Sequence, residues 1–174
     1  MRINTIGVVL LKLAESIIFR SIYRYALLLT LVDMRVCSLF CGIGGIDLAF
    51  EKAGHTVIWA NDSDMYACMT YRHNFPNVML AEGDIRDIDK ASIPDFDILT
   101  AGFPCQPFSV CGKKKGFSDP RGNLFFEVGN VVDAKQPKIV FLENVANLTE
   151  HDNGKTFNVI YNELAGRNYY IRYV

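Results

Sequence analysis

Short apolar runs alternate with amphipathic segments along most of the chain. The apolar runs are rich in β-branched and aromatic residues, which is typical of buried strands. The predicted strands span residues 36–40, 56–60, 78–80, 96–101, 138–142 and 169–174. The predicted helices, which carry apolar residues at helical spacing, span residues 46–53, 65–73, 124–134 and 154–164. This alternation predicts an α/β fold with a doubly wound, mostly parallel sheet, whose last strand is cut short by the end of the chain.

Residues 1–33 depart from this pattern. They are rich in Ile, Leu and Val, but their longest uncharged run, residues 3–11, is far short of the roughly 20 residues that span a bilayer. The leader could form a helix stripe that docks on the domain or on a membrane surface, or translation could begin at Met34. We treat residues 1–33 as an apolar leader and residues 34–174 as the domain, and we expect the domain to fold without the leader.

Size, charge and cysteine usage narrow the class of protein. With 174 residues, 50% of them apolar and 21% charged, the chain is long enough for one globular domain with its own core. The net charge of −1 gives no global basic field, so a nucleic-acid contact would need a local patch. Five cysteines and no evident signal peptide favour a reduced, cytoplasmic protein. One isolated Cys-x3-Cys pair predicts no metal site.

The segment 102–109, Gly-Phe-Pro-Cys-Gln-Pro-Phe-Ser, follows the predicted strand 96–101. Its glycine and prolines end the strand abruptly and place Cys105 on a stiff loop. Ligands of open α/β sheets bind at this carboxyl edge. Cys105 is therefore a candidate nucleophile, although a buried structural cysteine is the alternative.

Candidate ligand residues follow three other predicted strands. Gly42, Gly44 and Gly45 form a turn after the first strand, Asp62 follows the second and Asp84 follows the third. An acid about 20 residues beyond a glycine turn is placed to bind ribose hydroxyls, and Asp84 could accept a hydrogen bond from an adenine amine. Together they describe an adenosine-shaped site, although each alone is typical of an ordinary turn or helix cap.

A carboxyl group ends the predicted strand 138–142. Glu143 follows that strand, which we expect to neighbour the Cys105 strand. Burial there would raise the pKa of Glu143 and allow it to share a proton with a ring nitrogen. A capping carboxylate is the alternative.

Six segments occur in the order seen in DNA (cytosine-5-)-methyltransferases. They are 38–45 (SLFCGIGG), 61–62 (ND), 83–85 (GDI), 102–109 (GFPCQPFS), 121–125 (RGNLF) and 143–145 (ENV). The chain resembles this family over residues 34–174, and the leader lies outside the resemblance. The Pro-Cys-Gln loop and the Glu-Asn-Val step occur together at family-like spacing, which makes the match specific.

The resemblance implies a Rossmann-like methyltransferase fold, S-adenosylmethionine as methyl donor and a cytosine in duplex DNA as acceptor, as in restriction-modification. Cys105 would attack carbon 6 of a flipped cytosine, and Glu143 would hold ring nitrogen 3 and the exocyclic amine. The implied cofactor-binding residues are Phe40, Cys41, Gly42, Ile43, Gly44, Gly45, Asp62, Asp84, Ile85, Pro104 and Leu124. Ser109, Lys113, Lys114, Lys115 and Arg121 are candidates for DNA phosphate contacts, although such a charge run is often only a solvated surface.

The sequence also departs from the family pattern. Position 38 is Ser where many members have Asp, and position 62 is Asp where many have Glu. The family continues with a Gln-x-Arg-x-Arg step, a target-recognition region and a last segment that completes the cofactor pocket, and this chain stops before all three. We therefore expect either a catalytic portion that needs a second polypeptide or an inactive remnant. A nicotinamide-dependent oxidoreductase fits less well, because the glycine spacing is wrong and the Cys105 loop is left unexplained.

Overall fold

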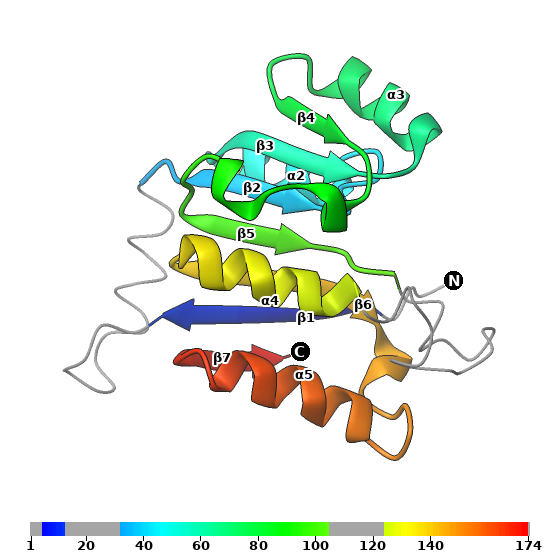
Figure 1. Cartoon of the computed structure of the whole chain (residues 1–174), viewed down its shortest axis with the longest axis vertical. Helices are drawn as coiled ribbons and strands as arrows, with labels where there is room; N and C mark the ends of the chain where they lie inside the picture. The colour runs from blue at the N-terminus through cyan, green and yellow to red at the C-terminus, as the bar shows by residue number, and fades with distance from the viewer. Residues whose placement is uncertain (1–4, 13–31, 105–123, 174) are drawn as a thin grey trace.

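The computed structural model describes residues 5–12, for which only the backbone is considered, and residues 32–104 and 124–173. A seven-stranded sheet runs through the molecule in the order β4-β3-β2-β5-β6-β1-β7 (Figure 1). The strands are β1 (Thr5–Lys12), β2 (Arg35–Leu39), β3 (Thr56–Asp62), β4 (Met79–Glu82), β5 (Ile98–Ala101), β6 (Ile139–Val145) and β7 (Tyr169–Tyr173). The α-helices are α2 (Gly45–Lys52), α3 (Met65–Asn74), α4 (Leu124–Lys135) and α5 (Lys155–Ala165). Short 3-10 turns occupy Ile85–Asp87, Lys90–Ser92 and Ala146–Leu148.

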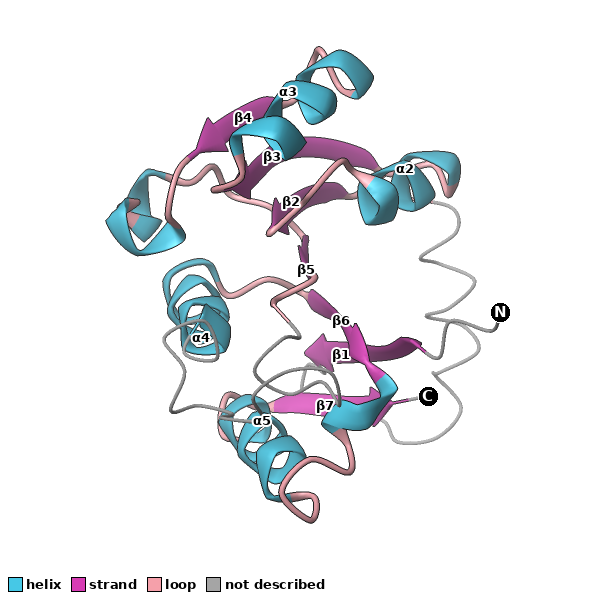
Figure 2. Ribbon diagram, turned by 90° about the vertical axis from the view of Figure 1, so that its right-hand side faces the viewer, coloured by secondary structure: helices cyan, strands magenta, loops and turns pink. Residues whose placement is uncertain are grey.

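The sheet is parallel except at β1. Strands β4, β3, β2, β5 and β6 pair in parallel, whereas β1 is antiparallel to both of its neighbours, β6 and β7. Helix α2 covers one face, and α4 and α5 cover the other (Figure 2). The predicted α/β class with a doubly wound, mostly parallel sheet is confirmed.

Consecutive residues of the central strands are buried on opposite faces. Ile98 packs with Val36 and Val57 on one face, while Leu99 packs with Val128 and Val140 in the larger core. Side chains alternate across a strand, so a strand covered on both faces must be apolar at successive positions. That requirement explains the unbroken apolar runs in the sequence.

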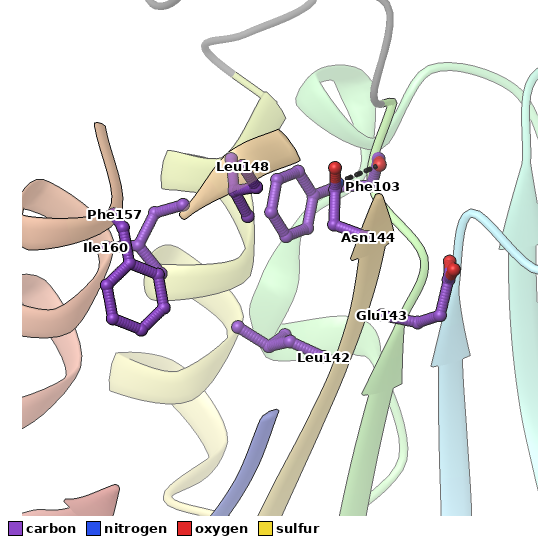
Figure 3. Close-up of a pocket in the computed structure, with 7 residues that line it drawn as sticks. All are labelled: Phe103, Leu142, Glu143, Asn144, Leu148, Phe157 and Ile160. Carbon is purple, nitrogen blue, oxygen red and sulfur yellow. Dashed lines mark hydrogen bonds between the residues drawn. The ribbon is translucent and has the colours of Figure 1, made fainter. Parts of the chain in front are cut away.

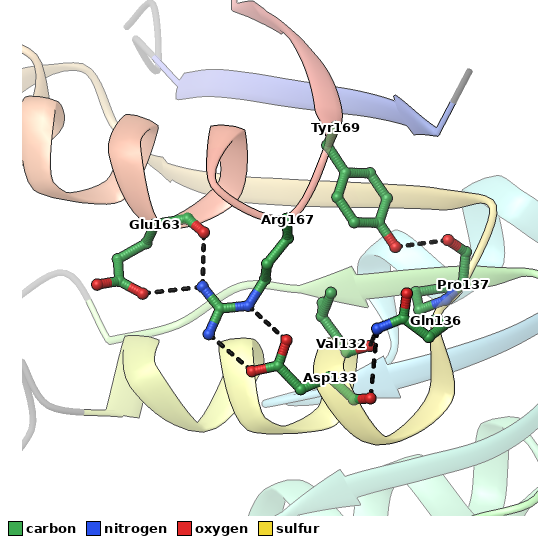
Figure 4. A network of polar contacts seen from close by, with 7 residues as sticks. All are labelled: Val132, Asp133, Gln136, Pro137, Glu163, Arg167 and Tyr169. Carbon is green, nitrogen blue, oxygen red and sulfur yellow. Dashed lines mark hydrogen bonds and ion pairs between the residues drawn. The ribbon is translucent and has the colours of Figure 1, made fainter. Parts of the chain in front are cut away.

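An arginine ties the last helix to α4. The Arg167 guanidinium donates to both carboxylate oxygens of Asp133, each at 2.8 Å, and to the carboxylate of Glu163 at 2.8 Å (Figure 4). In the same region the Tyr169 hydroxyl donates to the Pro137 carbonyl at 2.6 Å. A Cβ at Gly129 would lie 3.0 Å from this guanidinium, a tight contact, so the glycine gives the arginine room against α4.

Two elements differ from the sequence prediction. β6 extends beyond 142 to Val145 and so carries the Glu-Asn-Val step within the strand. Residues 5–12 of the expected leader form β1 inside the sheet, between β6 and β7. These residues therefore belong to the sheet, and the expectation that the domain folds without residues 1–33 stays a prediction. The helix stripe proposed for the leader lies outside the described residues, and a start at Met34 stays a prediction.

No helix in the described ranges is both long enough and apolar enough to cross a bilayer.

Candidate cofactor and catalytic site

The glycine turn after β2 is built from left-handed residues. Phe40, Gly42 and Gly44 have φ of 55°, 56° and 92°. A Cβ on Gly44 would lie 2.0 Å from the ring of Phe75, so glycine is required there for its φ and for space. The turn closes through a hydrogen bond from the Gly44 N–H to the Cys41 carbonyl at 2.9 Å, and α2 begins at once.

Asp62 joins this turn to the end of β3. Its Oδ2 accepts the Gly42 N–H at 2.8 Å, and its Oδ1 accepts the Asp64 N–H at 2.9 Å. The side-chain amide of Asn61 donates to the carbonyls of Ala81 and Gly83, which fixes the end of β4 beside them. The predicted glycine turn and acid are therefore brought together, with the carboxylate half-buried at the carboxyl edge of the sheet.

Asp84 and Ile85 have little of their side chains free to contact a ligand. Both oxygens of Asp84 are engaged by Arg86, and these hydrogen bonds lower the pKa of the Asp84 carboxyl to about 2. Ile85 is only 1% exposed and packs into the main core, which leaves little of its surface for a ligand. The half-buried Leu124 begins α4 and packs against the same core.

Glu143 lies on the strand beside β5, as predicted. β5 and β6 pair in parallel through Ala101 and Leu142, and Glu143 follows directly. Its Oε2 lies 3.4 Å from the position of a Cβ on Gly102, and the Ile46 side chain and the Phe40 carbonyl approach the same position. The carboxyl group therefore faces the glycine turn. Burial raises its pKa, and no other cause contributes.

The neighbouring side chains of β6 point to the opposite face. Leu142 and Asn144 extend toward α4 and α5, where a small apolar pocket is lined by Phe103, Leu142, Glu143, Asn144, Leu148, Phe157 and Ile160 (Figure 3). The Glu143 carboxylate points away from this pocket (Figure 3). The pocket is thus on the face opposite the glycine turn and is not part of the candidate site.

Asn144 fixes the start of the cysteine loop. Its side-chain amide donates to the Phe103 carbonyl at 2.8 Å and accepts the Val145 N–H at 3.0 Å. Pro104 is half-buried and is the last described residue before the gap. Cys105 lies outside the described residues, as do Ser109, Lys113, Lys114, Lys115 and Arg121, so their predicted roles stay predictions.

The described cysteines are not activated. Burial raises the thiol pKa of Cys37, Cys41 and Cys68, and nearby carboxylates raise it further. These thiols therefore remain protonated at neutral pH, which leaves them poor nucleophiles. The described ranges also contain no cluster of three or more acidic, His or Cys side chains that could hold a metal ion.

Sequence reasoning missed a buried acid beneath the glycine turn. Asp47 on α2 is fully buried and accepts a hydrogen bond from the Tyr71 hydroxyl at 2.7 Å, and Tyr71 stacks on Phe75. Burial raises the pKa of Asp47, against the lowering effect of its contacts with Ser38 and Tyr71. An acid in the first turn of a helix is ordinarily explained by the helix dipole, so the sequence held no signal of this burial.

The fold is α/β, and the glycine turn, Asp62 and Glu143 gather at the carboxyl ends of its parallel strands. A family model described as C-5 cytosine-specific DNA methylase matches residues 34–174. The chain is 50% identical to the type II methyltransferase M.Bsp6I of Bacillus sp. (strain RFL6), over 80% of this chain and 45% of that protein. It is 47% identical to the type II methyltransferase M.HhaI of Haemophilus parahaemolyticus, over 80% of this chain and 42% of that protein. The chain belongs to the C-5 cytosine-specific DNA methylase family.

Solved structures agree with this assignment. A putative DNA modification methyltransferase encoded within an E. coli prophage matches with a TM-score of 0.63 and 27% identity, over 77% of this chain and 38% of that chain. A Spodoptera frugiperda DNMT2 mutant matches with a TM-score of 0.59 and 28% identity, over 75% of this chain and 40% of that chain. The chain spans less than half the length of these relatives.

Proposed function

We propose that this chain transfers a methyl group from S-adenosylmethionine to carbon 5 of a cytosine in duplex DNA. The observation that carries the proposal is the meeting of two groups at one sheet edge. The Glu143 carboxyl lies over Gly102, three residues before Cys105, and faces the glycine turn that Asp62 holds. Glu143, proposed to hold the cytosine, lies at the end of β6, and the glycine turn, proposed to hold the cofactor, follows β2. The two groups therefore lie at the same edge of the sheet.

The described residues fit an adenosine-type cofactor. The turn from Phe40 to Gly45 exposes backbone where Gly42 has nothing within 4 Å of a potential Cβ, so a ligand can approach closely. Asp62 keeps unused lone pairs for ribose hydroxyls, since each of its oxygens accepts only one backbone N–H. Asp84 would share its carboxylate between Arg86 and the adenine amine. When bound, S-adenosylmethionine supplies an electrophilic methyl group.

The protein residues would carry the base chemistry. Cys105 as a thiolate bonds to carbon 6 of the cytosine, which makes carbon 5 nucleophilic toward the methyl group. Glu143 holds ring nitrogen 3 and the exocyclic amine. Burial raises the pKa of Glu143, which favours a proton on its carboxyl group, and that proton can be shared with nitrogen 3 as the ring accepts electrons. Carbon 5 would take the methyl group as its bond to the sulfonium sulfur breaks and the neutral thioether leaves. A water molecule would then take the carbon 5 proton and Glu143 would take back the nitrogen 3 proton, which expels the thiolate and restores the aromatic ring. Since the reacting atoms are stacked in a duplex, the cytosine must be flipped out.

DNA sequence readout would come from outside these residues. Base-edge contacts in the grooves specify sequence, and the chain spans only about 45% of the relative M.Bsp6I. We propose that residues outside 34–174, on a second polypeptide or on the same one, supply these contacts. The alternative is a remnant without activity. A labelled-methyl transfer assay on mixed-sequence duplex DNA, with and without the product of the adjacent reading frame, separates the two.

Asp62→Ala should weaken S-adenosylmethionine binding by roughly 10- to 100-fold, since a hydrogen bond to a charged group contributes about 1.5–3 kcal/mol. The change also leaves the Gly42 N–H without its acceptor and loosens the turn. Calorimetric titration with the cofactor measures the effect. Asp64→Ala is the matched control, because Asp64 caps α3 through the Ala67 N–H and does not touch the turn. Equal affinities for Asp62→Ala and the unmodified chain would contradict the ribose role.

Glu143→Gln should slow methyl transfer by about 10²- to 10³-fold while sparing cofactor affinity, because a neutral amide cannot transfer a proton to nitrogen 3.

The same change, Glu143→Gln, should raise the free energy of unfolding at neutral pH. A carboxyl whose pKa is raised in the fold binds more protons folded than unfolded, so its cost appears as pH rises above the ordinary glutamate pKa. Thermal unfolding of both proteins between pH 4 and 8 checks the sign, and the difference should vanish toward the acid end.

A further inference from the structure

A buried acid lies beneath the glycine turn. Asp47 stands in the first turn of α2, directly after the glycines, and is fully buried. Its Oδ2 accepts the Tyr71 hydroxyl at 2.7 Å, and its Oδ1 has no hydrogen-bond partner among the described residues. No lysine or arginine of the described ranges forms an ion pair with it. The contacts with Tyr71 and Ser38 favour the carboxylate form, and its charge is only partly offset within the protein.

The N-terminus of α2 would by itself favour an anion. Gly44 precedes the helix without a side chain that could cap its first N–H groups. Such N–H groups and the helix dipole attract negative groups, as in phosphate-binding glycine turns. The cofactor proposed above carries no phosphate, and its sulfonium sulfur is positive. A carboxylate in the first turn of α2 offsets the positive end of the helix, so Asp47 matches a cationic group better than an anionic one.

The charge of Asp47 acts on the turn itself. Tyr71 stacks on Phe75 with ring centroids 4.6 Å apart, and the Phe75 ring lies against the turn, so the acid and the turn belong to one packed unit. Burial raises the thiol pKa of Cys41 in the turn, and the charge of Asp47 raises it further, ahead of that of Asp62. A nearby negative charge resists formation of a thiolate. The two carboxylates therefore make the potential at the turn negative.

We propose that Asp47 sets the charge preference of the glycine turn, so that the turn favours the cationic sulfonium of S-adenosylmethionine over neutral or anionic ligands. The proposal rests on the function proposed above and deepens it. The thioether left after methyl transfer has lost the positive charge, so the same carboxylate favours cofactor over product. Because Asp47 is buried, it acts through its field and not by contact, and little water or salt screens that field.

Cys41 offers a reporter of this field that needs no bound cofactor. Its side chain is half-buried in the turn, and its reaction with a cationic or an anionic methanethiosulfonate reagent can be followed on its own peptide by mass spectrometry. Both reagents react with the same thiolate, so the ratio of their rates reports the local charge. In the full chain without ligand, the cationic reagent should react faster. Asp47→Asn should lower this ratio by about fivefold or more.

Calorimetric titration with S-adenosylmethionine and with S-adenosylhomocysteine, whose sulfur is neutral, measures the preference between ligands. Asp47→Asn should weaken binding of the cationic cofactor about 3- to 10-fold more than binding of the neutral product. A distorted turn would weaken both ligands alike, so a merely structural role of Asp47 would leave their ratio unchanged.

Glu51→Gln is the matched control for both measurements. It removes an exposed carboxylate one turn further along α2, where water and salt screen the charge. The rate ratio at Cys41 and the ratio of the two ligand affinities should stay within about twofold of the unmodified chain.

Several results would overturn the inference. One is an unchanged rate ratio at Cys41 in Asp47→Asn. Another is an unmodified chain whose Cys41 shows no preference for the cationic reagent, which needs no variant to fold. Equal losses of affinity for both ligands would make Asp47 a structural residue and overturn its role in specificity. A chain that binds neither ligand would overturn the proposed function, and the rates at Cys41 would still decide whether Asp47 sets the charge preference of the turn.

Discussion

Cys105→Ser is expected to abolish methyl transfer, with a loss of roughly 10⁴-fold or more, and to leave S-adenosylmethionine binding unchanged. A serine hydroxyl is a far weaker nucleophile than a thiolate. The polar contacts proposed for the cofactor come from the glycine turn, Asp62 and Asp84, and none involves the Cys105 side chain. Transfer of labelled methyl groups to duplex DNA, with the adjacent reading frame's product present, measures the first quantity, and calorimetry measures the second.

Cys111→Ser is the control for this change, since it removes a thiol from the same stretch of sequence without touching the Pro-Cys-Gln step. It should leave transfer within a small factor of the unmodified rate. Transfer retained by Cys105→Ser would remove the nucleophile from that position. The protonated thiols of Cys37, Cys41 and Cys68 would then offer no ready substitute.

Gly44→Ala is expected to have the largest effect on the fold of the site. The added methyl group would lie 2.0 Å from the Phe75 ring, on a residue whose φ of 92° strains any other side chain. Together these effects should cost about 2–4 kcal/mol of unfolding free energy and weaken cofactor binding. Urea unfolding measures the first effect, and calorimetric titration measures the second.

Two further variants separate strain from collision. Gly42→Ala shares the left-handed backbone, with a φ of 56°, but has nothing within 4 Å of the new methyl group, so it should cost only about 1–2 kcal/mol. In the double variant Gly44→Ala/Phe75→Leu the smaller side chain should relieve part of the clash. A double variant no more stable than Gly44→Ala would show that Phe75 is not the obstacle.

The parts of the site that sequence could predict depend on local patterns. About 20 residues are enough to show a strand, a glycine turn and an acid at the end of the next strand. Asp62 does contact the turn, because it accepts the Gly42 N–H. The position of Glu143 beside the Cys105 strand follows from the ordinary pairing of parallel strands, and β5 and β6 are indeed neighbours. Asp64, directly before α3, caps that helix by accepting the Ala67 N–H, which is common for an aspartate in this position.

The parts that sequence could not predict depend on distant contacts or on local competition. β1 pairs with strands near the far end of the chain, and nothing in residues 5–12 specifies that partner. Asp84 is engaged by Arg86, two residues along, whose side chain could equally have pointed to solvent. The contact of Asn144 with Phe103 joins two motifs whose contacting residues lie 41 positions apart in the sequence.

The three left-handed residues after β2 also bear on how fast and how tightly a ligand is captured. The bent conformation of Phe40, Gly42 and Gly44 is held by contacts within the protein, because Asp62 accepts the Gly42 N–H and the Phe75 ring lies against Gly44. A ligand that binds at this edge contacts a turn whose backbone is already ordered. Little conformational entropy of the turn is therefore lost on binding. Single substitutions at this edge can therefore change the affinity for a ligand without rebuilding the turn, because contacts within the protein set the shape of the turn.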